Sequence, residues 1–210
     1  MIIPLETLAV FFVTSLLLAL APGPDILFVL AQSAANGKKA GICITFGLCT
    51  GLIVHTSAVA LGVAVLFQTS MVAFTLLKGF GACYLLYLAW QAYRAPASEA
   101  AESTIGGRTD GRRLYLRGII MNVSNPKVSI FFLAFLPQFA DAGRGHMTMQ
   151  LILLGVVFIG AALLVFTAVS VLAATIGQYV VRSTQAQKFM NRLAGTLFAA
   201  LALKLACTEQ

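Results

Sequence analysis

The chain has 210 residues, of which 60% are hydrophobic and only 10% charged, with a formal net charge of +7. A soluble domain is about 45–50% apolar and about 25% charged, so this chain has too few charges to cover a water-exposed surface. The composition excludes a soluble enzyme, and the positive charge is better explained by the Lys and Arg of cytoplasmic loops in a membrane protein than by binding to nucleic acid.

Six apolar segments are expected to be transmembrane helices, which take about 20 apolar residues each. The first, residues 8–35, is interrupted near its middle by Pro22-Gly23-Pro24-Asp25. The fourth, residues 118–140, is interrupted by Asn125-Pro126-Lys127 and closed by Pro137. The other four are residues 40–67, 71–93, 147–181 and 189–207. Their long apolar runs without period-two alternation exclude a β-barrel, so we expect an all-α integral membrane protein.

A polar stretch rich in Pro, Ser, Glu, Gly and Arg separates the chain into two halves. Residues 94–117 are therefore expected to form a flexible linker, with one three-helix repeat in residues 1–93 and another in residues 118–210. Because each half has an odd number of spans, the second half enters the membrane in the opposite sense, as an inverted repeat.

The Lys and Arg residues of the short loops predict the orientation. The first, third and fifth loops hold nine of these residues, whereas the second and fourth hold only Arg144. Since cytoplasmic loops carry the excess of Lys and Arg, the linker is expected in the cytoplasm and both termini outside it, which is the periplasm of a bacterial inner membrane.

The two interrupted spans predict the binding site. Pro22, Gly23, Pro24 and Pro126 defeat the helical hydrogen-bond ladder, and interruptions at matching positions of two halves point to a transporter's site. Asp25 and Lys127 lie at these breaks, although one charge inside a span costs roughly 2.5–3.5 kcal/mol. A pair of opposite charges that meet is therefore expected.

Several roles at the breaks stay open. Asp25 either caps the second half-helix or contacts substrate. Asn122 and Asn125, three residues apart on one helix face, either bind a ligand or hold the broken backbone together.

Two further polar residues lie within apolar segments. Lys78 either snorkels to the membrane interface or is functional. His55 follows the helix-packing pair Gly47-x-x-x-Gly51, and it either relays protons or bonds a neighbouring helix. The sequence has no metal-ligand spacing, no expected cofactor and no Ser/His/Asp or related catalytic motif, so we expect a protein that is not an enzyme.

Three sets of residues resemble the lysine and homoserine/threonine exporter family of bacterial inner-membrane translocators. They are Pro22-Gly23-Pro24-Asp25; the run from Lys78 to Leu88; and Asn122 to Lys127, followed by Phe131-Phe132 and Leu136-Pro137-Gln138-Phe139. The likeness covers essentially the whole chain. It implies amino-acid efflux driven by the proton motive force, with Asp25, Lys78, Asn125 and Lys127 as functional positions.

The expected function is amino-acid export from the cytoplasm by proton antiport. Lys127 would meet the substrate carboxylate, and Asp25 or free carbonyls would meet its ammonium. No acidic cluster selects a cationic side chain, which favours a neutral substrate such as homoserine, threonine or leucine. The alternative is a transporter of another small metabolite or cation with the same architecture. The identity of the amino acid, the coupling ion and homo-oligomerisation stay open.

Overall fold

A computed structural model describes residues 2–69, 71–95, 110–182 and 184–207, and the regular structure in these ranges is entirely helical. The α-helices are α1 (Leu5–Leu20), α2 (Pro24–Asn36), α3 (Lys38–Thr69), α4 (Met71–Arg94), α5 (Gly111–Val123), α6 (Pro126–Ile130), α7 (Met147–Arg182) and α8 (Thr184–Cys207). After α6 the chain continues through a π-helical turn, η1 (Phe131–Phe135), and two 3₁₀ turns, η2 (Leu136–Phe139) and η3 (Ala142–Arg144). The expectation of an all-α fold is confirmed.

Within the described residues, up to four segments have the length and apolar character of membrane spans, if each bent helix pair is counted as one span. Two are single helices, α3 over Lys38–Gly62 and α7 over Met147–Thr175. The other two are bent pairs: α1 and α2 meet at 60°, and α5 meets the segment Pro126–Phe139 at 50°. Both predicted breaks are therefore present. The six-span arrangement stays a prediction for α4 and α8, which have 24 residues each and thus a length of about 36 Å.

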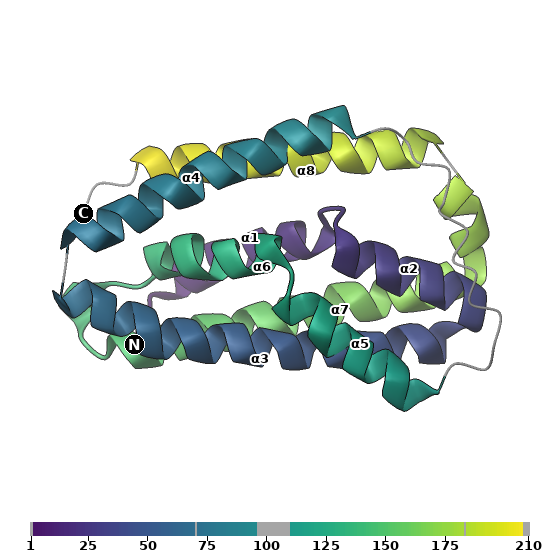
Figure 1. The fold of residues 1–210 in the computed structure, drawn as a ribbon, viewed down its shortest axis with the longest axis horizontal. Helices are drawn as coiled ribbons and strands as arrows, with labels where there is room; N and C mark the ends of the chain where they lie inside the picture. The colour runs from purple at the N-terminus through teal and green to yellow at the C-terminus, as the bar shows by residue number, and fades with distance from the viewer. Residues whose placement is uncertain (1, 70, 96–109, 183, 208–210) are drawn as a thin grey trace.

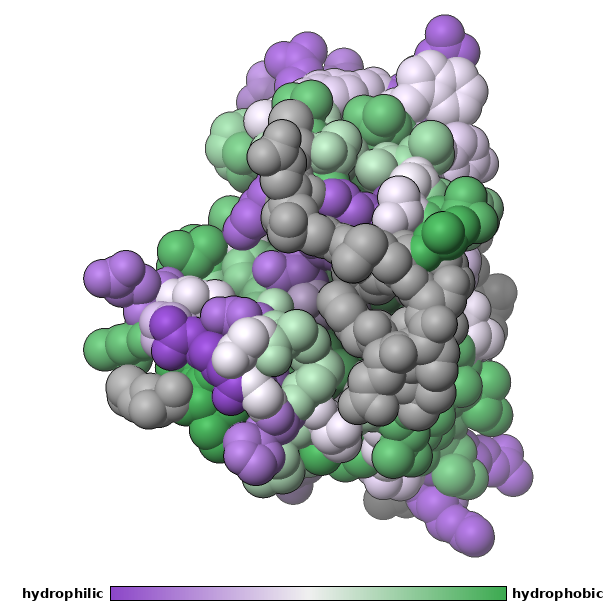
Figure 2. Space-filling model, turned by 90° about the vertical axis from the view of Figure 1, so that its left-hand side faces the viewer, coloured by the Kyte–Doolittle hydropathy of each residue, from purple (hydrophilic) through white to green (hydrophobic). Residues whose placement is uncertain are grey.

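Large apolar side chains are exposed on many sides of the molecule. Figure 2, which looks onto one end of the bundle, shows hydrophobic side chains reaching the surface on several sides with hydrophilic ones between them. The exposed set includes Leu5, Phe46, Leu61, Leu76, Phe80 and Leu164, from α1, α3, α4 and α7. Such a surface suits lipid rather than water, in agreement with the composition.

The helices form two layers (Figure 1). In the larger layer α3 packs between α5 and α7, and α1 and α2 pack against α7. In the smaller layer α4 lies along α8, and this pair meets the rest of the molecule chiefly where α4 contacts η1. The two breaks lie on the side of the larger layer that faces α4 and α8, since residues of both breaks and of these two helices line one cavity.

Glycines allow α3 and α5 to approach at backbone distance. A Cβ atom on Gly118 of α5 would lie 2.7 Å from the Ile44 carbonyl oxygen and 3.1 Å from the Gly47 Cα atom. A Cβ atom on Gly47 would collide with the Tyr115 carbonyl. The packing role predicted for the Gly47-x-x-x-Gly51 pair is confirmed, because small residues are what permit such close helix crossings in membranes.

One boundary differs from the expectation. The fourth span was expected to begin at Gly118 after a linker, but α5 begins at Gly111. Asp110 caps this helix by accepting a hydrogen bond from the backbone N–H of Arg112 at 3.1 Å. Residues 111–117 are therefore helical, and the linker prediction for residues 96–109 lies outside the described residues.

The α3–α5 crossing generates a stability prediction. We expect Gly118→Ala to lower the free energy of unfolding by about 1–3 kcal/mol, because backbone atoms of α3 cannot move aside as a flexible side chain would. Gly62→Ala on α3 is the matched control, since a Cβ atom there meets nothing within 4 Å. Thermal unfolding in detergent measures both variants, and equal melting temperatures would contradict the prediction.

Candidate functional site

The first break leaves a backbone carbonyl without a helical partner. Helix α1 ends at Leu20, Ala21 is extended with ψ 126°, and α2 resumes at Pro24. Pro22 and Pro24 have no N–H to donate, and proline fits the first turn of α2 because its missing N–H would be unpaired there anyway. The carbonyl of Ala21 consequently needs a donor from elsewhere in the protein.

The second break has the same local form. Helix α6 begins with Pro126, after Asn125 in an extended conformation. The Asn125 Oδ1 atom accepts a hydrogen bond from the backbone N–H of Lys127 at 3.0 Å, so Asn125 caps this short helix. Each half of the chain thus restarts its broken helix with proline at the first turn.

Asp25 is held by the opposite break. Its side chain is buried, with 5% exposed, and its two carboxylate oxygens each accept a hydrogen bond from an asparagine amide. Asn122 Nδ2 donates to Oδ2 at 2.9 Å, and Asn125 Nδ2 donates to Oδ1 at 2.9 Å. The helix-capping hypothesis for Asp25 is not supported, because both described hydrogen bonds of the carboxylate go to the other half rather than to an N–H of α2.

Lys127, at the second break, binds to the first break. Its Nζ atom donates to the Ala21 carbonyl oxygen at 3.1 Å, which supplies the donor that the first break lacks. Gly23 makes room for it, since a Cβ atom on Gly23 would lie 2.9 Å from Nζ. Lys127 also lies 5.9 Å from the centre of the Phe198 ring of α8. The expected pair of opposite charges therefore lies at one site, but Asp25 and Lys127 do not form a direct ion pair within 4.0 Å in the described residues.

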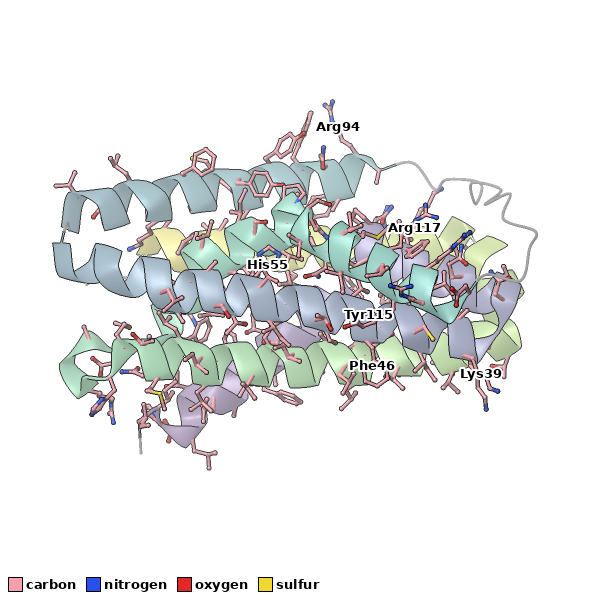
Figure 3. All side chains as sticks on the ribbon, turned by 60° about the horizontal axis from the view of Figure 1, so that its bottom comes forward. Lys39, Phe46, His55, Arg94, Tyr115 and Arg117 are labelled. Atoms are coloured by element: carbon pink, nitrogen blue, oxygen red, sulfur yellow. The ribbon has the colours of Figure 1, made fainter. Side chains whose placement is uncertain are left out.

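His55 of α3 contacts the backbone of Asn122 at the same site. Its Nε2 atom lies 3.1 Å from the Asn122 carbonyl oxygen, which can only accept, so the ring donates this bond. The ring also lies 5.7 Å from that of Phe132. Figure 3 places His55 near the middle of the long axis, far from Lys39 and Arg117 at one end. Of the two roles left open for His55, the structure supports bonding to a neighbouring helix.

Gly51 of α3 leaves the space that the side chain of Asn122 occupies. A Cβ atom on Gly51 would lie 2.7 Å from the Asn122 Oδ1 atom and 2.8 Å from its Cβ atom. This Oδ1 atom is buried and has no hydrogen-bond partner in the described part of the chain. Since an unpaired buried acceptor costs about 1–3 kcal/mol, its presence at this site calls for a ligand or a water molecule.

Two cavities adjoin the breaks, and Lys127 lines both. The smaller has a volume of about 20 Å³ and is lined by Asp25, Asn122 and Lys127 together with apolar side chains of α1, α2, α3, α6 and α7. The larger has a volume of about 380 Å³. It lies between the breaks and the α4–α8 layer, and it is lined by Pro22, Gly23, Pro24, Leu27, Tyr84, Leu88, Gln91, Ala92, Ala95, Asn125, Pro126, Lys127, Asn191 and Phe198.

The structure brings most of the predicted site residues together. Asp25, Asn122, Asn125, Lys127 and the prolines meet at the two cavities. Lys78 of α4 lines neither cavity. Sequence reasoning missed the Ala21 carbonyl and the polar cavity walls Tyr84, Gln91 and Asn191. Gln91 and Asn191 carried a signal, as polar residues in apolar segments, but a backbone carbonyl carries none.

The Asp25 contacts generate a second prediction. We expect Asn122→Leu to lower the free energy of unfolding, because it leaves one oxygen of a buried carboxylate without its donor. In a double-mutant cycle with Asp25→Ala, the two changes are expected to couple by about 1–3 kcal/mol. The control is Ser124→Ala at the exposed side of the same break, which should not couple to Asp25. Additive effects of Asn122→Leu and Asp25→Ala would contradict the prediction.

Comparisons with known proteins identify the family. The LysE type translocator family matches residues 16–209. An uncharacterized membrane protein of Vibrio cholerae is 31% identical over 199 residues, which is 95% of this chain and 96% of the relative. Homoserine/homoserine lactone efflux proteins of Salmonella typhimurium and Salmonella typhi are each 32% identical over 196 residues, which is 93% of this chain and 94% of each relative. No solved structure matches. The resemblance found in the motifs is confirmed: the chain belongs to the LysE type translocator family, which consists of membrane efflux transporters and not enzymes.

Proposed function

We propose that the protein exports a neutral amino acid of the homoserine type from the cytoplasm by proton antiport. The observation that carries the proposal is the larger cavity, in which Lys127 presents an ammonium group at the meeting point of two broken helices. The efflux proteins of Salmonella support the substrate class, since homoserine is in their name and their identity to this chain extends over 93% of it.

The size of the larger cavity fits a small substrate. Its volume of about 380 Å³ lies at the lower end of the 300–1,000 Å³ typical of ligand sites. Tyr84, Gln91 and Asn191 add uncharged hydrogen-bonding groups to walls that are otherwise mostly apolar. Such walls suit a small amino acid whose side chain is uncharged.

The charge of the larger cavity indicates where the substrate carboxylate binds. Lys127 is the single charged side chain among the described residues that line it. Its ammonium has three N–H donors, and the Ala21 carbonyl takes one of them. The cavity also borders the N-terminus of α2, where unpaired N–H groups and the helix dipole favour an anion. The carboxylate is therefore bound by Lys127 and the start of α2.

The position of the larger cavity fits uptake of substrate from the cytoplasm. Gln91 and Ala95 in its wall adjoin Arg94, and the cavity thus lies toward the end of the molecule that carries the Lys and Arg residues of the odd-numbered loops. Figure 3 shows Arg117 and Lys39 on the same side of His55 as Arg94, with Lys39 nearest that end. With six spans in two inverted repeats, this end faces the cytoplasm of a bacterial inner membrane and both termini lie in the periplasm.

The second candidate is a transporter of another small metabolite or of a cation. A cation is disfavoured, because the one charged side chain lining the larger cavity is itself positive. Efflux from cells preloaded with a panel of amino acids, organic acids and amines separates these candidates. Export of an amine or an organic acid with no export of any amino acid would replace the proposal with the second candidate.

The role assigned to Lys127 generates a prediction with an internal control. Homoserine carries a carboxylate and an ammonium, whereas homoserine lactone has no free carboxylate. We expect Lys127→Ala to reduce homoserine export at least about 30-fold, since losing the partner of a desolvated charge costs about 2–5 kcal/mol. Export of the lactone should fall much less.

The control for Lys127→Ala is Lys39→Ala, an exposed lysine at the start of α3 that should leave both exports unchanged. Export is measured with labelled substrate in cells that express equal amounts of each variant. An equal loss for homoserine and its lactone would show that Lys127 acts on the fold or the transport cycle and not on the carboxylate.

The proposed orientation generates a prediction about fusions. Alkaline phosphatase fused after residue 210 should be active, and green fluorescent protein fused there should be dark, because the C-terminus is expected in the periplasm. Insertion of each reporter within residues 96–109 should give the reverse pattern. A fluorescent and phosphatase-inactive C-terminus would overturn the six-span orientation.

A further inference from the structure

The smaller cavity has the size and the polar groups that hold one water molecule. A volume of about 10–15 Å³ is enough for one water, and this cavity has about 20 Å³. Buried waters make two to four hydrogen bonds to groups that would otherwise be unpaired. Three polar residues line the cavity: Asp25, Asn122 and Lys127.

The hydrogen-bonding groups around the smaller cavity are complementary to a water molecule. Lys127 has N–H donors beyond the one used by the Ala21 carbonyl, and the Asp25 carboxylate has lone pairs beyond those used by the two asparagines. Asn122, which lines the cavity, has a buried Oδ1 atom without a partner in the described ranges. A water in this cavity can accept from Lys127 and donate to Asp25.

The remaining wall of the smaller cavity is apolar. It is formed by Leu18, Ala19, Ile26, Leu52, Val128, Phe158, Ala162 and Phe166. A hard metal cation takes six or more oxygen ligands, which this wall does not provide. The cavity therefore suits one water molecule better than a metal ion.

Lys127 connects the cavity that Asp25 lines with the larger cavity. Asp25 lines the smaller cavity and not the larger, whereas Lys127 lines both. The other elements around the Asp25 carboxylate bring no further charge: α1 and α7 contribute apolar side chains, and His55 of α3 reaches the site only through the Asn122 carbonyl. Asn125 also bonds to Asp25 and lines the larger cavity, but its amide does not titrate, so Lys127 is the group lining both cavities that can carry a proton between them.

We propose that the smaller cavity is a binding site for one water molecule that passes the coupling proton between Asp25 and Lys127. The proposal rests on the proposed function as an exporter. The Lys127 ammonium first releases a proton to a solvent water in the larger cavity and becomes a neutral amine. The amine then takes a proton from the bound water, which in turn takes the proton of the protonated Asp25 carboxyl. Asp25 becomes a carboxylate, the solvent water becomes hydronium, and the bound water and the Lys127 ammonium are regenerated.

This relay links the proton to the substrate through one residue. Lys127 is the last donor on the proton's path and also the group that binds the substrate carboxylate. Release of the proton leaves Asp25 negative and Lys127 positive, and this is the state in which the larger cavity binds an anionic group.

The test compares two activities of the purified full-length protein in liposomes. Counterflow of labelled homoserine at equal pH on both sides reports binding and exchange. Accumulation driven by a pH gradient reports coupling. The ratio of gradient-driven accumulation to counterflow is the quantity measured for each variant, so that changes in the amount of folded protein cancel.

The cavity is filled from two sides. Ala162→Val on α7 and Ala19→Val on α1 each add methyl groups to its wall, and displacing a well-ordered water with an apolar group loses that water's hydrogen bonds. We expect both variants to lower the ratio by at least about tenfold, which is about 1.4 kcal/mol. Ala162→Ser adds a hydroxyl to the same wall and should keep the ratio close to that of the unchanged protein.

Ala161→Val is the matched control, because Ala161 is an equally buried neighbour on α7 that does not line the cavity. Asp25→Asn removes the proton acceptor and should abolish gradient-driven accumulation. An unchanged ratio in both Ala162→Val and Ala19→Val, or in Asp25→Asn, would overturn the relay. The absence of counterflow for every amino acid in the unchanged protein would overturn the proposed function itself, which is a distinguishable result.

Discussion

The structure depends on an exchange of polar groups between its two broken helices. The carboxylate of Asp25 in the first half takes its hydrogen bonds from Asn122 and Asn125 in the second, and Lys127 of the second half donates to the carbonyl that the first break releases. A buried polar group that lacks a partner costs about 1–3 kcal/mol. Polar groups of each break are thus satisfied by the other half, and these hydrogen bonds link the two halves of the chain.

Close packing of α3 against α5 positions the side chains that form these hydrogen bonds. Gly47 and Gly118 bring the two backbones into contact, and Gly51, one turn along α3, accommodates the side chain of Asn122. His55, a further turn along, donates to the carbonyl of the same asparagine. One face of α3 therefore fixes both the position and the orientation of the residue that donates to Asp25. The small residues that shape the helix crossing therefore also shape the candidate site.

Much of this architecture could be predicted from sequence, because proline and charge leave strong local signals. Pro22, Pro24 and Pro126 marked both breaks, and the charged residues beside them marked the site. The partners could not be predicted. The ammonium of Lys127 donates to a backbone carbonyl, and because every residue has a carbonyl, the sequence does not indicate which one is used. Asp25 accepts from two side-chain amides rather than from the expected lysine. The start of α5 was predicted seven residues late, because its first turns are basic and only its later turns are apolar. Hydropathy identifies the apolar part of a helix that can lie in the membrane, and it does not detect a polar first turn of the same helix.

The contacts of Lys127 connect ligand binding to the state of the first break. If the proposed function holds, a substrate carboxylate in the larger cavity shares the Lys127 ammonium with the Ala21 carbonyl, and a charged acceptor forms a stronger hydrogen bond than a neutral one. A shift of Lys127 toward that carboxylate would weaken its bond to the carbonyl at the end of α1 and favour a rearranged α1–α2 junction. The α4–α8 layer covers this junction, because residues of both helices and of the first break line the larger cavity. Under the proposed function, substrate binding therefore acts on the junction between the two half-helices beneath this layer.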